Sequence, residues 1–293
     1  MLTSPHGTTY TGGNRMYSLE KSIAIWEETG NHGTKAERIA RGKVWHPYYA
    51  YLAQKQIGKS YVPNPQNEEI VEYLFREGIL KSNDSVLDIG CGMGGYALAM
   101  ASRCERVVAM DNSEECIEVL KNKAVSANLR NIEPYTISWE EYLPIEKFDV
   151  TFSSMCPAIC NLEELERMES ITRRQCCLIA VTRGSYDKHR MRMMKELQLK
   201  PKGGMTTEAI HYINVLYLMG RQPNVRCFTR TSRHRVDVET FLEQYLNYFP
   251  IFGMEKKDAE KYLKRYIAEN AVNGQIEDES RHNLAVISWK VPE

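Results

Sequence analysis

Two aspartates, each at the end of a short apolar run, are the residues of this sequence best placed to do chemistry. Asp88 stands in the run Val86–Ile89, and Asp111 closes the run 106–110. Short runs of apolar, β-prone residues are typical of strands inside a parallel sheet. In such a sheet the carboxyl ends of neighbouring strands face one crevice. We therefore expect the two carboxylates to lie near each other and to bind one ligand.

A turn rich in glycine follows Asp88. Gly90, Gly92 and Gly94 lack a Cβ atom, so the backbone can turn sharply and approach a ligand closely. Residues 96–102 continue as a helix, whose start supplies free N–H groups and the positive end of a dipole. Such a turn can hold the polar part of a nucleotide-like cofactor. The glycines alone also fit the G-x-G-x-x-G pattern of dinucleotide-binding proteins, or a tight turn with no ligand.

Asp88 separates these alternatives. A pyrophosphate at this turn would meet the like charge of Asp88, whereas a cationic ligand or an amino group would be attracted. Residues 88–94 fill every fixed position of (D/E)-x-G-x-G-x-G, and here the chain resembles the class I S-adenosylmethionine-dependent methyltransferases. The resemblance implies S-adenosylmethionine as the cofactor and no metal. It places Asp88 near the methionine amino group and Asp111 on the ribose hydroxyls.

The resemblance also implies where the cofactor contacts the chain. The expected contact residues follow the first four strands: Asp88, Gly90, Cys91, Gly92, Asp111, Asn112, Ser138, Trp139, Glu140, Ser154 and Met155. Ser138 departs from the family, which often has an acid there to bond the adenine. Residues 154–157 also lack the Asn/Asp-Pro-Pro-aromatic sequence of amide and purine N-methyltransferases. Trp139 can stack on the adenine or cover the edge of the core, and both roles stay open.

The order of apolar runs predicts an α/β fold. Strands are expected at 86–89, 106–110, 132–137, 147–153, 175–182, 224–236 and 283–291, with helices between most of them. Two late strands after five βα units match the methyltransferase sheet and are not expected of a dinucleotide domain. The prediction is a Rossmann-like, doubly wound sheet of seven strands with the last strand antiparallel, plus an N-terminal helical cap.

The chain is expected to divide into two parts. Residues 1–78 would form an N-terminal extension and helical cap or lid, in which 1–15 are mobile or fold over a filled site. Residues 79–293 would form the cofactor-binding domain, with a helical insertion at 185–222. The pocket for the acceptor is expected between the cap and the insertion. Its candidate residues are Tyr49, Tyr61, Cys156, Arg183 and His211, although any one aromatic residue of the cap can equally be core packing.

Composition narrows the partners. The 293 residues carry no formal net charge, so no bulk field draws the protein to nucleic acid or to an anionic membrane. No run of about 18 apolar residues and no signal-like start appears, so we expect a cytoplasmic protein with no membrane contact. The eight cysteines form no C-x-x-C pair and are expected to be free thiols. Basic residues gather in 183–202 and 221–235, where they form either a solvated face or a contact surface.

These observations predict transfer of the methyl group of S-adenosylmethionine to a small-molecule acceptor through an N, O or S nucleophile. The alternatives are transfer of the aminocarboxypropyl group, a protein or RNA methyltransferase, and a non-catalytic partner protein that binds the cofactor. The Cys156-Pro157 pair faintly resembles RNA cytosine-C5 methyltransferases, which use a cysteine nucleophile. The acceptor atom, a general base and the oligomeric state stay open.

Overall fold

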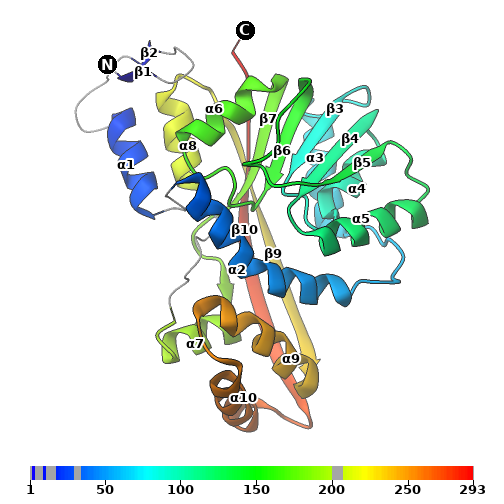
Figure 1. Ribbon diagram of the computed structural model, residues 1–293, viewed down its shortest axis with the longest axis vertical. Coiled ribbons are helices and arrows are strands. Elements are labelled where there is room, and N and C mark those ends of the chain that lie inside the picture. The colour runs from blue at the N-terminus through cyan, green and yellow to red at the C-terminus, as the bar shows by residue number, and fades with distance from the viewer. Residues whose placement is uncertain (1, 4–8, 11–17, 30–33, 200–206, 293) are drawn as a thin grey trace.

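The structure is a computed structural model that describes residues 2–3, 9–10, 18–29, 34–199 and 207–292 (Figure 1). Near the N-terminus it describes only the pair β1 (Leu2–Thr3) and β2 (Thr9–Tyr10), which run antiparallel. The rest of residues 1–15, expected to be mobile or to fold over the site, lies outside the described part.

A mixed sheet forms the centre of the molecule. Its long strands lie in the order β5-β4-β3-β6-β7-β10-β9, and the short strand β8 also pairs with β10. All are parallel to their neighbours except β10, which runs antiparallel to β7, β8 and β9. This confirms the predicted seven-stranded sheet with an antiparallel last strand, and β8 adds an unexpected eighth. The strands are β3 (Ser85–Ile89), β4 (Arg106–Asp111), β5 (Ile132–Thr136), β6 (Phe148–Ser154), β7 (Thr172–Val181), β8 (Tyr186–Asp187), β9 (Asn224–Asp237) and β10 (Gln275–Lys290).

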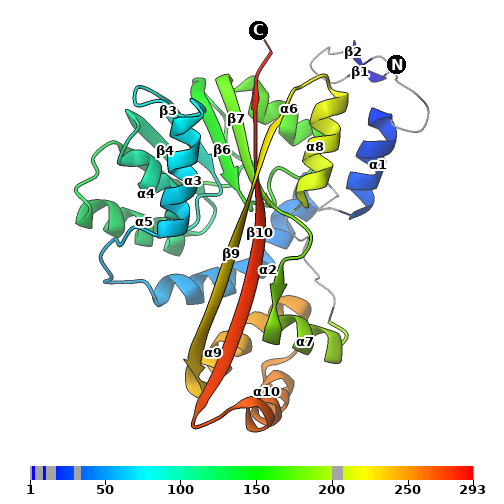
Figure 2. The same cartoon turned by 180° about the vertical axis from the view of Figure 1, so that it is seen from behind.

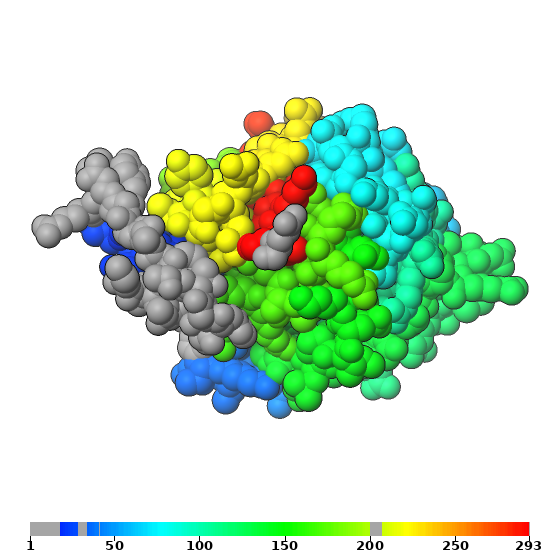
Figure 3. Space-filling view, turned by 90° about the horizontal axis from the view of Figure 1, so that it is seen from above, coloured from blue at the N-terminus to red at the C-terminus, as the bar shows by residue number. Residues whose placement is uncertain are grey.

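Helices cover both faces of this sheet because successive strand residues point to opposite sides. In β3, Val86 packs into the core under one helical layer, whereas Leu87 and Ile89 pack into the core under the other. The first layer holds α3 (Pro65–Arg76), α4 (Gly95–Ala101) and α5 (Glu114–Ser126), and the second holds α1 (Leu19–Thr29), α6 (Leu162–Ser170) and α8 (Ala209–Leu218). Figure 3 views the sheet from the edge at which its parallel strands begin, and the end of β10 is exposed there between the yellow and green segments.

A second group of helices lies on the far half of the β9–β10 hairpin. The hairpin pairs from Gln275↔Asp237 to Ser288↔Asn224 and extends well past the other strands (Figures 1 and 2). It carries α7 (Lys188–Glu196), α9 (Val238–Tyr248), the 3-10 helix η1 (Phe249–Phe252) and α10 (Lys256–Asn270). We call these four helices the distal lobe, and they share an aromatic core of their own. The expected insertion 185–222 is therefore divided, because α7 belongs to the distal lobe and α8 covers the sheet.

The expected N-terminal cap likewise divides into separate elements. Trp26 of α1 is fully buried and donates its ring N–H to Thr207, and its ring lies 5.2 Å from that of Tyr212 in α8. α3 packs against α4 as part of the first helical layer. Only α2 (Lys35–Gln54) crosses between the sheet and the distal lobe (Figure 1). On it, Trp45 and Tyr48 pack against Tyr248 of the lobe, so these two aromatics are packing residues.

A buried carboxylate fastens α2 to the sheet. Glu164 of α6 accepts hydrogen bonds from the Arg38 guanidinium of α2 at 2.6 Å and from the Trp139 ring N–H at 2.6 Å. Arg167 adds a third, at 3.3 Å. Glu164 is 4% exposed, so these donors replace the water that its charge would otherwise bind. One side chain thus joins α2, the loop after β5 and α6.

None of the helices within the described ranges is long and apolar enough to cross a membrane. All eight cysteines are free. Cys156 and Cys160, which stand four residues apart, differ in exposure, since Cys160 is fully buried and Cys156 is only partly so.

We predict that Glu164→Ala destabilises the fold by about 3–5 kcal/mol, because it removes the buried carboxylate that accepts from both Arg38 and the Trp139 ring N–H. Glu163→Ala is the matched control, since Glu163 is exposed on the same turn and should cost less than about 1 kcal/mol. Urea unfolding of both variants measures the difference. Equal losses would show that the buried network does not hold α2.

Candidate active site

The glycine turn is folded over the end of β4. The amides of Gly90 and Cys91 both donate to the Met110 carbonyl at 2.9 Å. The Asp111 carboxylate accepts from the Gly92 amide at 2.8 Å and from the Ser113 amide at 2.9 Å. The turn after β3 and the turn after β4 are therefore held by one carboxylate, and the ends of the two strands lie side by side as the sequence predicted.

Gly90 and Gly92 differ in how much space surrounds them. A Cβ atom at Gly90 would stand 2.3 Å from the Cys156 Sγ atom, and φ there is +72°. A Cβ atom at Gly92, where φ is +53°, would meet nothing within 4 Å. Gly90 is thus required by close packing of the β3 and β6 ends, whereas the backbone at Gly92 is open to a ligand.

Asp88 and Asp111 lie close enough to affect each other's charge. Asp88 is 2% exposed, and burial followed by the charge of Asp111 raises its pKa to about 8. Burial also raises the pKa of Asp111, against the effect of the amides that donate to it. A bound cation or ammonium group would favour the ionised form of both carboxyls and so lower their pKa. The arrangement fits the charge that the sequence predicted for the ligand.

Loop residues 138–141 follow β5 and contribute little open surface. Ser138 donates to Glu141 at 2.7 Å, and Glu140 lies 3.9 Å from Arg38 of α2. Trp139 is 3% exposed, and the Arg167 guanidinium lies 4.0 Å above its ring. Of the two roles left open for Trp139, the observed packing is that of a core residue.

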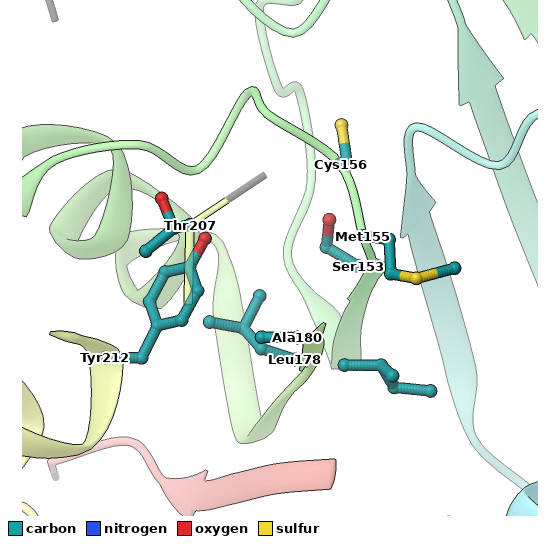
Figure 4. A pocket seen from close by; sticks show the side chains of 8 residues that line it. Ser153, Met155, Cys156, Leu178, Ala180, Thr207 and Tyr212 are labelled. Atoms are coloured by element: carbon teal, nitrogen blue, oxygen red, sulfur yellow. The ribbon is translucent and has the colours of Figure 1, made fainter. Parts of the chain in front are cut away.

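A small pocket lies at the end of β6. Met155 has a positive φ of 49°, is 42% exposed and turns the chain away from the strand. Figure 4 shows Ser153, Met155 and Cys156 on one side, with Thr207 and Tyr212 across from them. Burial raises the pKa of the Cys156 thiol to about 12, so the thiol stays protonated at neutral pH.

The five expected acceptor residues do not all converge. Tyr49 of α2 lies beside the site: partial burial, followed by the nearby Cys156 and Asp111, raises the pKa of its phenol, and the residue as a whole is 43% exposed. Tyr61 does not reach it, since its amide donates to Ser126 at the far end of α5. α5 begins beside Asp111, and its length puts Ser126 about 18 Å further along the helix axis.

The other two candidates meet at the start of α8. The Arg183 side chain is 92% exposed and lies 3.7 Å from Glu208. Burial lowers the pKa of His211, and the charges of Glu208 and Arg183 act on it in opposite directions. Arg183 therefore points into solvent, because the chain turns outward two residues after β7.

Two residues at the site escaped the sequence analysis. Tyr96 follows the glycine turn, and its hydroxyl accepts from Arg230 of β9 at 2.7 Å. The sequence analysis included Arg230 only as one basic residue of the stretch 221–235, which alternates with a period of two residues. Other members are neutralised locally, since Arg221 pairs with Glu169 at 2.8 Å and Arg233 lies 3.1 Å from Glu279.

Comparison with known proteins agrees with this geometry. Residues 86–175 match the methyltransferase-domain family. The chain is 30% identical over 113 residues to a release factor glutamine methyltransferase of Buchnera aphidicola, covering 38% of this chain and 40% of that one. It is 28% identical over 138 residues to the 23S rRNA (uracil(1939)-C(5))-methyltransferase RlmD of Legionella pneumophila, covering 43% and 31%.

Residues 86–175 form a class I S-adenosylmethionine-dependent methyltransferase domain. The chain spans half or less of the length of these enzymes. An uncharacterized Haemophilus influenzae protein matches over more, at 21% identity over 253 residues, covering 84% of this chain and 88% of that one. Among solved structures, the YcgJ protein of Bacillus subtilis superposes with a TM-score of 0.51 at 13% identity, covering 78% of this chain and all of that one, which supports the fold.

We predict that Gly90→Ala destabilises the methyltransferase domain by about 2–4 kcal/mol, because it combines a positive φ with a clash against Cys156. Gly92→Ala meets the positive φ alone and should cost clearly less. Chemical denaturation without ligand measures both. Equal losses would mean that the Gly90–Cys156 contact relaxes at no cost.

We predict a pH dependence of stability that belongs to Asp88. The pKa in the folded domain is about 8 and the ordinary value is 3.8, so between them the folded protein binds one more proton than the unfolded chain. The free energy of unfolding should therefore fall from pH 5 to pH 8 and level off above.

Asp88→Asn should flatten that slope, as measured by urea unfolding at several pH values. Asp149→Asn is the control, because interactions with Ser85 and Arg173 lower the pKa of Asp149. Titration of Asp149 therefore changes the free energy of unfolding only below pH 4. A slope that Asp88→Asn leaves unchanged would assign the titration to another group.

Proposed function

We propose that this protein transfers the methyl group of S-adenosylmethionine to a small-molecule acceptor. The observation that carries the proposal is the pair Asp88 and Asp111, buried beside a glycine turn whose backbone is open at Gly92. Asp88 would attract the ammonium of the methionine part, and Asp111 would accept from the ribose hydroxyls. The free thiols further support a cytoplasmic enzyme.

The cofactor supplies a methyl group on a sulfonium, which leaves readily as a neutral thioether. The residues of the chain then have three tasks: to bind the cofactor, to align the acceptor with the methyl and to exclude water. α2 and the distal lobe face the carboxyl edge of the sheet (Figure 1), where they can perform the last two tasks. On α2, Tyr49 lies near enough to Cys156 and Asp111 to interact with both.

A small acceptor is favoured over a long nucleic acid or an extended protein surface. Nucleic acid needs an extended positive surface, whereas Arg221, just before β9, and Arg233 within it are paired with acids. Ser154–Pro157 also lacks the Asn/Asp-Pro-Pro-aromatic sequence expected for an amide acceptor. The raised pKa of Cys156 opposes a thiolate nucleophile of the kind used in C5 methylation.

Transfer of the aminocarboxypropyl group is the second candidate, because the same cofactor site would serve both reactions. The mass added to the acceptor distinguishes them. Incubation with candidate metabolites and S-adenosylmethionine should give products heavier by one methyl group. Tight binding of a partner protein without turnover would favour the non-catalytic alternative.

We predict that S-adenosylhomocysteine binds with at least micromolar affinity and that Asp111→Ala weakens binding by about 2–3 kcal/mol, through lost charge-assisted bonds. Asp149→Ala is the control, because Asp149 bonds Ser85 at the opposite ends of β3 and β6 and should leave affinity unchanged. Calorimetry on folded variants measures both. Binding of a nicotinamide dinucleotide and of neither adenosyl ligand would reverse the assignment.

A further inference from the structure

Arg230 is a half-buried cation held only by neutral groups. Its terminal nitrogen donates to the Tyr96 hydroxyl at 2.7 Å, the Gln66 carbonyl at 3.1 Å and the Asn67 amide oxygen at 3.2 Å. Its Nε atom is buried without a hydrogen-bond partner. Throughout the described ranges, no carboxylate lies within ion-pair distance of this guanidinium, in contrast to Arg221 and Arg233 on either side of it.

The surroundings of Arg230 belong to the cofactor site. Tyr96 follows Gly95 directly, and the Asn67 side chain lies 2.8 Å from where a Cβ atom at Gly95 would stand. The Tyr96 hydroxyl also hydrogen-bonds Ser154 at the end of β6. Arg230 therefore lies between the glycine turn and the strand end at which the acceptor is expected.

A cation removed from water without a counter-charge destabilises a protein unless a ligand supplies that charge. The guanidinium is suited to a carboxylate, with which it forms charge-assisted hydrogen bonds. Tyr96, Asn67 and Gln66 accept bonds from one terminal nitrogen and orient the group, and the second terminal nitrogen is left for such a ligand. The Arg230 guanidinium therefore has no counter-charge among the described residues, and a carboxylate ligand could supply one.

We infer that Arg230 binds a carboxylate of a bound ligand. The inference rests on the proposed function, which brings two carboxylates to this region: that of the methionine part of the cofactor, and one carried by an acidic acceptor. Both present the same chemistry to Arg230, and the experiment below separates them.

The first arm compares S-adenosylhomocysteine with its decarboxylated analogue by calorimetry. If the cofactor supplies the carboxylate, Arg230→Gln should weaken S-adenosylhomocysteine binding about 10- to 100-fold and leave affinity for the analogue unchanged. Arg230→Lys should retain part of the difference. Arg226→Gln is the matched control, because Arg226 is exposed on the same strand and stacks on Phe228.

The second arm uses malonate as a dicarboxylate probe of the acceptor side. If the acceptor supplies the carboxylate, Arg230→Gln should bind S-adenosylhomocysteine normally. Malonate should then raise the melting temperature of the loaded wild-type protein but not that of the loaded variant. If Arg230 had a purely structural role, Arg230→Gln would instead weaken the binding of both adenosyl ligands equally. Tyr96→Phe, which removes an anchoring bond and keeps the Arg230 charge, would have the same effect.

The inference is overturned if wild-type and Arg230→Gln proteins do not differ toward either adenosyl ligand or malonate, or if both adenosyl ligands weaken equally. Failure of the wild-type protein to bind S-adenosylhomocysteine would count against the proposed function instead. Malonate titration of the unloaded proteins would then still decide whether Arg230 binds a carboxylate.

Discussion

Two acids buried at neighbouring strand ends impose the main constraint on this protein. Burial and the charge of Asp111 raise the pKa of Asp88, and burial raises that of Asp111, so ionising both carboxyls is unfavourable until a positive group enters the site. Asp111 is tolerated because the Gly92 and Ser113 amides donate to it. Asp88 is tolerated because it can keep its proton. The glycine turn and its close packing on Cys156 follow from the need to keep both acids at one place.

The enclosure of the site depends on another buried acid, Glu164. Glu164 gathers Arg38, Trp139 and Arg167 and so fastens α2 across the carboxyl edge of the sheet. At its other end, α2 packs through Trp45 and Tyr48 on the distal lobe. One helix, α2, therefore links the cofactor site to the distal lobe. Movement of the lobe relative to the sheet would displace α2 and with it Tyr49.

The part of the chain that matches known enzymes is its cofactor half. The family match covers residues 86–175, whereas α2 and the whole distal lobe lie outside it. Because the same sheet edge accepts different substrates when different elements cover it, recognition of the acceptor is expected to depend on those outer elements. The long β9–β10 hairpin carries the lobe and also carries Arg230, which connects the two regions.

The sequence alone determined the sheet, the cofactor motif and the placement of Asp88 and Asp111, because strand periodicity, glycine spacing and strand-end acids are local features. The tertiary structure decided what depends on distant contacts. It divided the expected insertion between two regions, buried Trp139 under Arg167, took Tyr61 to the far end of α5 and brought Arg230 to Tyr96. Partners this far apart in the sequence leave no spacing pattern, since only packing determines which side chains meet.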